Sequence, residues 1–413
     1  MTGISAIRWI GAAAVFTSLA ASTLVLREPA PFDVAMMATM IFLGLFGLAR
    51  PGPFARAGTI CWLVITGLGL IGANFAFDPV LATKHVLISG FLAACSVTIA
   101  GFITIDPERH IALLIRAYLI AGLIAALAAI VGYFGLLPGA EALFSKYGRA
   151  SGTFKDPNVL GAALVPAVLF AFHAILTRPL GRALLHAMAT LVLIFAILLS
   201  FSRGAWISLL LSGLLVAYGA FVTSRRNRER LRLIVIAGAG AMIIALAIPL
   251  ALQSSSVRGL MTERASLAQN YDVGHEGRFG GQAKAVDLII GAPFGLGALT
   301  FGRRYHHEEA HNVYLSQFMN TGWLGGLAYL ALVLATLAAG FRSALVPGPL
   351  QGPLIVLTAA FATTALEGLI IDSDHWRHFY LLLGALWGLV DAVGGRSRAI
   401  TGWRTQPGRT APA

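Results

Sequence analysis

Long apolar runs separated by short polar segments cover most of this chain of 413 residues. Most runs are close to the roughly 20 residues that a helix needs to cross the hydrocarbon core of a bilayer. With 57% hydrophobic and 12% charged residues, the chain has too few polar side chains to cover a soluble globule. The pattern predicts an all-α polytopic membrane protein with about twelve transmembrane helices, the second and twelfth runs being the shortest. The runs lie at about 7 to 26, 33 to 49, 57 to 76, 85 to 105, 111 to 137, 157 to 177, 183 to 201, 204 to 223, 232 to 252, 311 to 341, 350 to 371 and 378 to 393.

Loops that hold several arginines alternate along the chain with loops that hold few. If the N-terminus is cytoplasmic, the opposite short loops carry little more than Arg27, Lys84, Arg203 and Arg377. The positive-inside rule therefore predicts that both termini are cytoplasmic. Because the charges sort by side, the net charge of +12 reflects topology and not a nucleic-acid partner. The cytoplasmic loops would contain Arg8, Arg50, Arg56, Arg109, Arg178, Arg182, Arg225, Arg226, Arg228, Arg230, Arg232, Arg342, Arg396, Arg398, Arg404 and Arg409.

Two predicted outer loops are longer than the others. One extends from about Pro138 to Asp156, and the longest extends from about 253 to 310. Within the longest loop, residues 276–290 lack proline and predict a short helix with Arg278 and Gln282 one turn apart. Long ordered loops over a helical scaffold often carry binding and chemistry. The polar composition of residues 395–413 predicts a disordered cytoplasmic tail. Because no soluble domain is indicated, residues 1–413 are predicted to form a single transmembrane domain.

Arg203 is a single cation between two uncharged apolar runs, 183–202 and 204–224. A guanidinium at the edge of the hydrocarbon costs several kcal/mol unless it reaches the interface or finds an anion. One interpretation is a clamp for an anionic headgroup. The other is an interfacial arginine that contacts lipid phosphates.

Further features of the outer side favour an anion site. Lys155 and Arg278 would converge on the same region as Arg203. Asp156, followed by Pro157 and Asn158, predicts an N-capped helix start whose free N–H groups face that region.

Residues 307–311, His-Glu-Glu-Ala-His, match the H-E-x-x-H pattern of zinc proteases. The motif requires a helix and a third ligand, for which Asp372, Asp374, His375 and His378 are the candidates. An alternative interpretation uses His311 alone, as a base or acceptor-orienting group at the start of a span, or simply as a cap. Glu367, near the outer end of the eleventh span, would either bind an acceptor or pair with an arginine.

Three segments together resemble the O-antigen ligase family, which includes lipopolysaccharide O-antigen ligases and related polysaccharide polymerases. They are Gly152-Thr-Phe-Lys-Asp-Pro-Asn158; Ser200-Phe-Ser-Arg-Gly-Ala-Trp206; and the stretch from Gly277-Arg278 through Pro293-Phe-Gly-Leu-Gly297 to His311-Asn312-Val-Tyr-Leu315 and Gly322-Trp-Leu-Gly325. The likeness covers about 150 to 330 and agrees in order, spacing and topology.

This resemblance implies a C-type glycosyltransferase fold and inverting transfer of a glycan from undecaprenyl pyrophosphate, with no cofactor and no catalytic metal. The reaction would occur at the periplasmic face of a bacterial inner membrane, which makes 253–310 a periplasmic loop. By position, Arg203 and Arg278 match the family's essential arginines and His311 its essential histidine. Lys155, Asn158, Asn312 and Glu367 are candidate substrate-binding residues.

The sequence leaves the acceptor open. A ligase would use lipid A-core as acceptor, whereas an O-antigen or exopolysaccharide polymerase would use a lipid-linked glycan, and both share the donor chemistry. A glycolipid or polysaccharide transporter is the alternative from a different functional class, because a polytopic chain with intramembrane charges also suits transport. An intramembrane zinc protease is a minor alternative.

Overall fold

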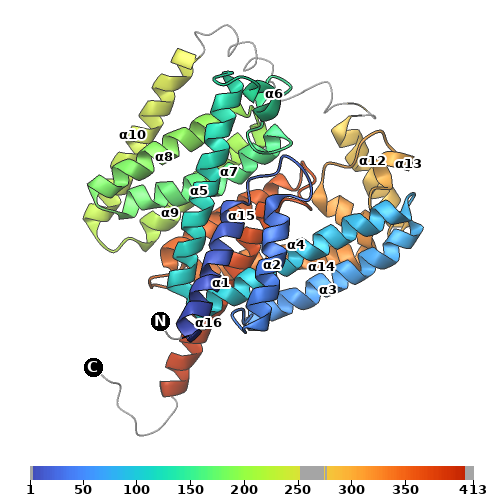
Figure 1. Cartoon of the computed structure of the whole chain (residues 1–413), viewed down its shortest axis with the longest axis horizontal. Helices are drawn as coiled ribbons and strands as arrows, with labels where there is room; N and C mark the ends of the chain where they lie inside the picture. Colours follow the sequence, from blue (N-terminus) through green and yellow to red (C-terminus); the bar gives the residue numbers. More distant parts are fainter. Residues whose placement is uncertain (1–2, 252–273, 275–276, 405–413) are drawn as a thin grey trace.

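A computed structural model describes residues 3–251, 274 and 277–404 of the chain (Figure 1). Nearly all of the described elements are helices. A short antiparallel hairpin, with Ser145 paired to Ala150, interrupts them between α6 and α7. In chain order, the elements are α1 (Gly3–Ala20), α2 (Pro31–Leu45), α3 (Pro53–Gly72), η1 (Ala73–Phe75), α4 (Pro79–Ile105), α5 (Pro107–Tyr133), α6 (Ala140–Phe144), β1 (Ser145–Lys146), β2 (Arg149–Ala150), α7 (Pro157–Thr177), α8 (Leu180–Leu199), α9 (Arg203–Thr223), α10 (Asn227–Ala251), α12 (Arg278–Gly291), α13 (Phe301–Arg304), α14 (Val313–Ala344), α15 (Gln351–Glu367) and α16 (Arg377–Arg404).

The prediction of a polytopic helical membrane protein is confirmed in outline. Every predicted apolar run overlaps one of these helices. Within the described residues, 8 helices are long and apolar enough to cross a membrane: α3 with η1, α4, α5, α7, α8, α9, α14 and α16. Helices α1 and α2 are apolar but shorter, and the total of twelve spans stays a prediction.

Proline and aspartate set many of the helix starts. Asp78, Asp106 and Asp156 cap α4, α5 and α7 by accepting a backbone hydrogen bond, and a proline follows each of them directly. Proline is well placed there because the first helical N–H has no intrahelical partner. These caps fix the residue at which each of the three helices begins.

Helix α15 occupies the middle of the bundle and packs against α7, α9, α14 and α16 (Figure 1). Helix α16 crosses α4 at close range because Gly384 and Gly388 face the α4 backbone. A side chain at either glycine would collide with the carbonyl oxygens of Ser96 and Ala100, respectively. Glycines four residues apart are a common device for close packing of membrane helices, where attraction comes mainly from van der Waals contact.

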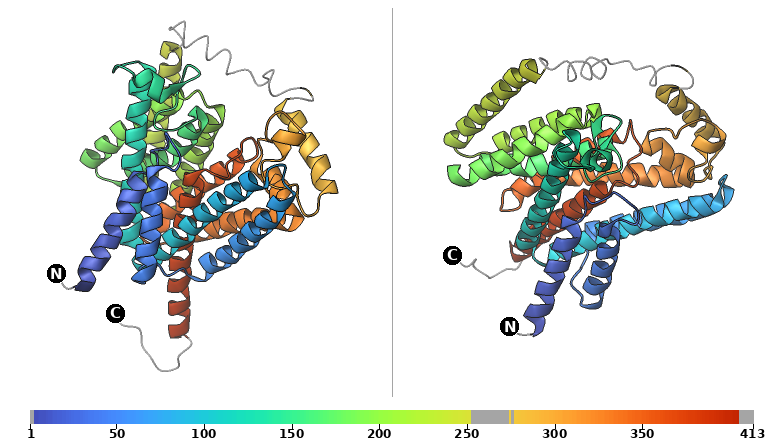
Figure 2. Two further views of the ribbon diagram at one scale, coloured as in Figure 1. Left: turned by 45° about the vertical axis from the view of Figure 1, so that its right-hand side comes forward. Right: turned by 45° about the horizontal axis from the view of Figure 1, so that its top comes forward.

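Contacts between helix ends agree with the alternation of the predicted spans. Asp391 of α16 accepts hydrogen bonds from the N–H groups of Phe54 and Ala55 at the start of α3. The start of α1 and the end of α16 lie at the same end of the molecule (Figure 2). At the opposite end, Arg377 donates to both carboxylate oxygens of Asp33, at 2.8 and 2.7 Å. In each contact, the two helix ends are ones that the predicted order of spans places on the same side of the membrane.

Two predicted boundaries change. Helix α16 continues to Arg404, so the prediction of a disordered tail from residue 395 is wrong for residues 395–404, where proline is absent. In the loop from 253 to 310, the described part contains α12, as predicted, and also α13. Residues 253–273, 275 and 276 of that loop lie outside the described residues.

Helix α14 is kinked at Gly322, whose φ of 73° and ψ of −175° are not helical. The turn that begins at Pro293 fits into this kink. The Pro293 carbonyl accepts a hydrogen bond from the N–H of Trp323 at 3.0 Å, and the Met319 carbonyl accepts one from Leu296 at 2.6 Å. A methyl group at Gly322 would collide with the Pro293 carbonyl oxygen, so only glycine allows this approach.

We expect Gly322→Ala to destabilise the protein and reduce its activity together. The positive φ with extended ψ at this position is essentially restricted to glycine and alone costs an alanine about 1–3 kcal/mol, and the collision with Pro293 adds to this cost. The measurement is thermal unfolding of the detergent-solubilised protein. Gly67→Ala is the control because nothing lies within 4 Å of its added methyl group, so this change should be neutral or stabilising. Equal behaviour of the two variants would contradict the role of the kink.

Candidate functional site

His311 lies in the loop between α13 and α14 with a φ of 48°, in the left-handed region. Its Nδ1 is 3.4 Å from a carboxylate oxygen of Asp372, and its Nε2 is 3.2 Å from a carboxylate oxygen of Glu308. Asp372 is itself oriented by a 2.9 Å hydrogen bond from the hydroxyl of Ser316. The imidazole is therefore held between two carboxylates.

These neighbours change the proton affinity of His311. The hydrogen bond to Asp372 raises the pKa of the imidazole, burial opposes this, and Glu308 adds a smaller increase. The positive charge of Arg278 acts in the opposite direction. The net effect is a raised pKa, which makes His311 a stronger base than an isolated histidine.

Arg278 is the first residue of α12, and α12 is fastened beside His311. One turn after Arg278, the side-chain amide of Gln282 donates to the carbonyl of His311 at 3.3 Å and to that of Leu369 at 3.2 Å. Lys284 donates to the carbonyl of Tyr305 on the other side. The one-turn spacing predicted for Arg278 and Gln282 is thus correct, and the structure brings Arg278 close to His311.

Arg203 is the first residue of α9. The preceding turn contains Phe201 in a left-handed conformation, and Ser202 caps the helix by accepting from the N–H of Ala205. Glu367, at the end of α15, is 7% exposed, lies beside Gly204 and accepts a hydrogen bond from Ser208 of α9. The start of α9 is therefore packed on the last turn of α15.

The start of α14 is attached to the same turn. The N–H of Val313 donates to the carbonyl of Gly368 at 2.8 Å, and the hydroxyl of Tyr314 donates to the carbonyl of Ala365 at 2.7 Å. Arg203, the first residue of α9, and His311, in the loop directly before α14, are far apart in sequence and are consequently brought to one junction.

The other predicted substrate-binding residues have structural partners. Lys155 forms an exposed ion pair with Glu28 at 3.2 Å. Asn158 accepts a 2.7 Å hydrogen bond from Arg149, whose Nε donates to the carbonyl of Ser200. Asn312 caps α14 by accepting from the N–H groups of two following residues, at 3.1 and 3.2 Å. A role for these side chains toward substrate stays a prediction.

Arg149 is the residue that the sequence interpretation missed. Its buried guanidinium joins the 138–156 loop to the turn that precedes Arg203. In sequence it is one of three cations in a polar loop, and no local pattern separates it from Lys146 or Lys155. Only the packing of β2 against the end of α8 distinguishes it.

The H-E-x-x-H pattern does not form the helix that a zinc protease needs. Residues 305–312 lie between α13 and α14 without helical structure, and Glu308 is a hydrogen-bond neighbour of His311. Two histidines four apart share a face only on a helix. The geometry therefore favours the interpretation in which His311 acts alone.

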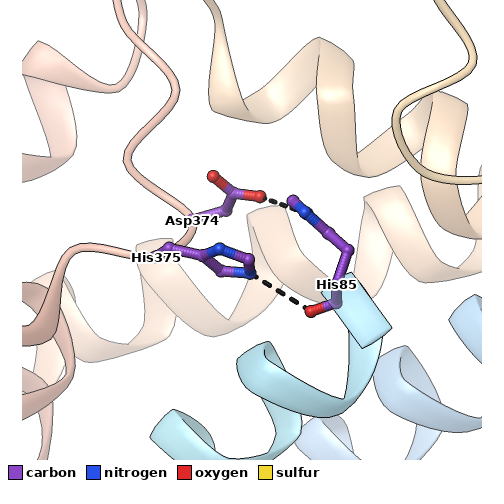
Figure 3. A group of neighbouring side chains, drawn as sticks. All are labelled: His85, Asp374 and His375. Carbon is purple, nitrogen blue, oxygen red and sulfur yellow. Dashed lines mark hydrogen bonds and ion pairs between the residues drawn. The ribbon is translucent and has the colours of Figure 1, made fainter. Parts of the chain in front are cut away.

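A separate group of possible metal ligands lies nearby. His85 of α4 is close to Asp374 and His375, which belong to the loop between α15 and α16 (Figure 3). None of the predicted catalytic residues belongs to this group. The two clusters are connected through the loop itself, because Asp372 precedes Asp374 by two positions.

Comparison with known proteins finds a match in the region that contains the predicted catalytic residues. No curated protein matches the chain. Residues 188–330, less than half of the chain, match the family model described as O-antigen ligase. That segment contains the turn before α9, the α12 region and the start of α14, and therefore Arg203, Arg278 and His311. The match agrees with the predicted resemblance: residues 188–330 of this chain are similar to the O-antigen ligase family.

Proposed function

We propose that the protein is a membrane glycosyltransferase of the O-antigen ligase type, which transfers a glycan from undecaprenyl pyrophosphate to lipid A-core. The observation that carries the proposal is the junction at the end of α15, where His311, held between carboxylates, lies beside the helix that begins with Arg278 and near the start of α9. The family match to residues 188–330 supports a ligase-like or polymerase-like function.

The placement of the two arginines favours an anionic ligand. Arg203 and Arg278 are each the first residue of a helix. A cation at that position is unfavourable to the helix by about 0.3–1 kcal/mol, because the N-terminal end of the helix already carries partial positive charge. Helix stability therefore does not explain them. Two guanidinium groups together with free helix N–H groups suit a pyrophosphate, on which negative charge grows as it leaves.

His311 would supply the base. In the proposed step its imidazole takes the proton of the acceptor hydroxyl, the acceptor oxygen bonds to the anomeric carbon, and the bond from that carbon to the pyrophosphate oxygen breaks. Undecaprenyl pyrophosphate leaves with the electron pair, and the anomeric configuration inverts. Asp372 is a positioning residue in this scheme, because it holds the imidazole and raises its basicity. The scheme uses no nucleotide sugar and no metal at the reacting atoms.

The proposed donor chemistry is compatible with two acceptors. An O-antigen or exopolysaccharide polymerase would use the same donor chemistry with a lipid-linked glycan as acceptor. Deletion of the gene followed by analysis of the glycan distinguishes the two functions. Accumulation of polymerised but unligated glycan supports the ligase, whereas accumulation of single repeat units supports the polymerase.

We expect purified protein in detergent to release undecaprenyl pyrophosphate when it receives lipid-linked donor and acceptor. Arg203→Lys and Arg278→Lys should insert normally but slow release at least ~10-fold, about 1.4 kcal/mol, because lysine keeps the charge and loses the planar fork. Arg303→Lys is the control, since the exposed Arg303 side chain pairs with Asp78 among the described residues.

Equal rates in the Arg203 and Arg303 variants would show that Arg203 is structural. A glycolipid transporter makes a different prediction for the same preparation. It would move intact lipid-linked glycan across vesicles and form no new glycosidic bond in detergent. Repeated absence of bond formation with several acceptors would favour transport.

His311→Ala should abolish transfer, and His307→Ala should leave most of it. Because only neutral His311 can accept a proton, activity should rise with pH through the pKa of His311. Asp372→Asn removes the largest cause of the raised pKa, so the rising limb should shift to lower pH and the plateau rate should fall. Glu308→Gln should shift the limb in the same direction by a smaller amount.

The pH profile of transfer by the four variants, together with wild type, tests this role. Asparagine at position 372 can still accept the hydrogen bond from Ser316, so the loop should be retained. An unchanged rising limb in Asp372→Asn, with lower activity at every pH, would show that Asp372 affects folding and not the basicity of His311.

We further propose that the site faces the periplasm and that both termini are cytoplasmic. In a background where Cys61 and Cys95 are alanine, a cysteine at Glu141 should react with an impermeant thiol reagent in intact spheroplasts, and one at Asn227 should react only after lysis. Both positions are exposed, so accessibility to solvent is matched. The reverse pattern would place the site in the cytoplasm and exclude the proposed donor side.

A further inference from the structure

His85, Asp374 and His375 form a compact group between α4 and the loop that joins α15 to α16 (Figure 3). One potential ligand atom from each residue lies within 4.8 Å of the others. The imidazole Nε2 of His85 is 2.7 Å from a carboxylate oxygen of Asp374. These side chains are 13% and 10% exposed, so the group is largely shielded from solvent.

The hydrogen bonds of His375 leave one ring nitrogen suited to a metal. Its Nε2 is 3.1 Å from the backbone carbonyl of His85 and 3.1 Å from the hydroxyl of Ser89. Because a carbonyl only accepts, Nε2 must carry the hydrogen, and in the neutral ring Nδ1 keeps its lone pair. A histidine that binds a metal usually donates its other N–H to a carbonyl or carboxylate in this way.

The charge around the group also favours a cation. The carboxylates of Asp372 and Glu309 lie close enough for their charges to act on His85, in addition to the directly bonded Asp374. Three carboxylates therefore act on His85, and Asp374 also acts on His375.

We propose that His85, Asp374 and His375 bind one divalent transition-metal ion, with zinc as the expected occupant. Two imidazoles and one carboxylate suit zinc and its neighbours, whereas magnesium and calcium prefer oxygen ligands alone. Bonds of about 2.0–2.1 Å to a tetrahedral zinc ion place ligand atoms roughly 3.3 Å apart. Nε2 of His85 and the Asp374 oxygen, now 2.7 Å apart, would therefore separate slightly to admit the ion between them, which side-chain rotations can supply. The ion would replace the proton that His85 and Asp374 share.

The ion would act as a structural clamp. It would join α4 to the loop from Gly368 to Trp376, and the same loop supplies Asp372 to His311. The proposed site is independent of the H-E-x-x-H pattern, since it uses neither His307 nor His311. It is also separate from the transfer step, because its ligands do not include the base or the two arginines.

The test measures metal binding directly. Full-length protein in detergent is freed of metal by chelator, dialysed and titrated with Co²⁺, whose visible absorption reports its ligands, and with Zn²⁺ in competition against a chromophoric chelator. Wild type should bind one ion per chain. His85→Gln and His375→Gln should weaken binding at least ~100-fold, because each removes a ligand. His186→Gln and His307→Gln are controls. His307 is exposed, His186 is half-buried and bonded to the carbonyl of Arg182, and neither belongs to the group, so both changes should leave the affinity unchanged.

Binding should also raise the thermal unfolding temperature of wild type and of the controls, but not that of the ligand variants. If the ligand variants fold poorly, zinc-edge X-ray absorption of wild type replaces them and should show two imidazole ligands. Failure of wild type to bind at micromolar metal would overturn the proposal. So would a ligand shell without imidazole, or loss of binding in His307→Gln, and each result can be obtained whether or not the protein transfers glycan.

Discussion

The last turn of α15 is the constraint on which the site depends. Three segments that are distant in sequence are fixed to it. The start of α9 packs against Glu367, the N–H of Val313 at the start of α14 donates to the carbonyl of Gly368, and Gln282 of α12 donates to the carbonyl of Leu369. Gly368 and Leu369 directly follow α15, and the carbonyl of Ala365 in its last turn accepts from Tyr314. Carbonyls at a helix C-terminus have no partner within the helix, so they are available to hold neighbouring segments. The orphan groups of one helix end therefore assemble the site.

A polytopic bundle limits where such chemistry can be placed. In hydrocarbon, backbone polar groups must be satisfied within helices, so irregular backbone and charged side chains gather at helix ends. The kink at Gly322 shows one consequence, because the turn from Pro293 enters α14 only where the backbone departs from helical geometry. This contact carries the segment that follows α12 back onto the bundle and keeps α12 beside His311.

The loop from Gly368 to Trp376 takes part in two groups of side chains. Asp372 orients the imidazole of His311, and Asp374 and His375 contact His85 on α4. A displacement of this loop would change both the position of the proposed base and its proton affinity. The packing of α4 is thereby linked to the chemistry at His311, although α4 supplies no predicted catalytic residue.

The sequence by itself determined the helical membrane architecture, the helix at α12 and the three residues proposed for catalysis. Apolar run length, proline positions and short motifs are local properties, and a bilayer converts them into helices with little dependence on the rest of the chain. Tertiary structure decided which polar residues share a site. Asp372 and Arg149 lie in ordinary polar loops, and only the packing of α15 and β2 shows that one orients His311 and the other holds the turn before Arg203. It also decided against the zinc motif, because residues 307–311 lie outside a helix, and it joined His85 to residues almost three hundred positions away. Such contacts depend on how helices cross, which is a property of the whole bundle and leaves no periodic signal in any one segment.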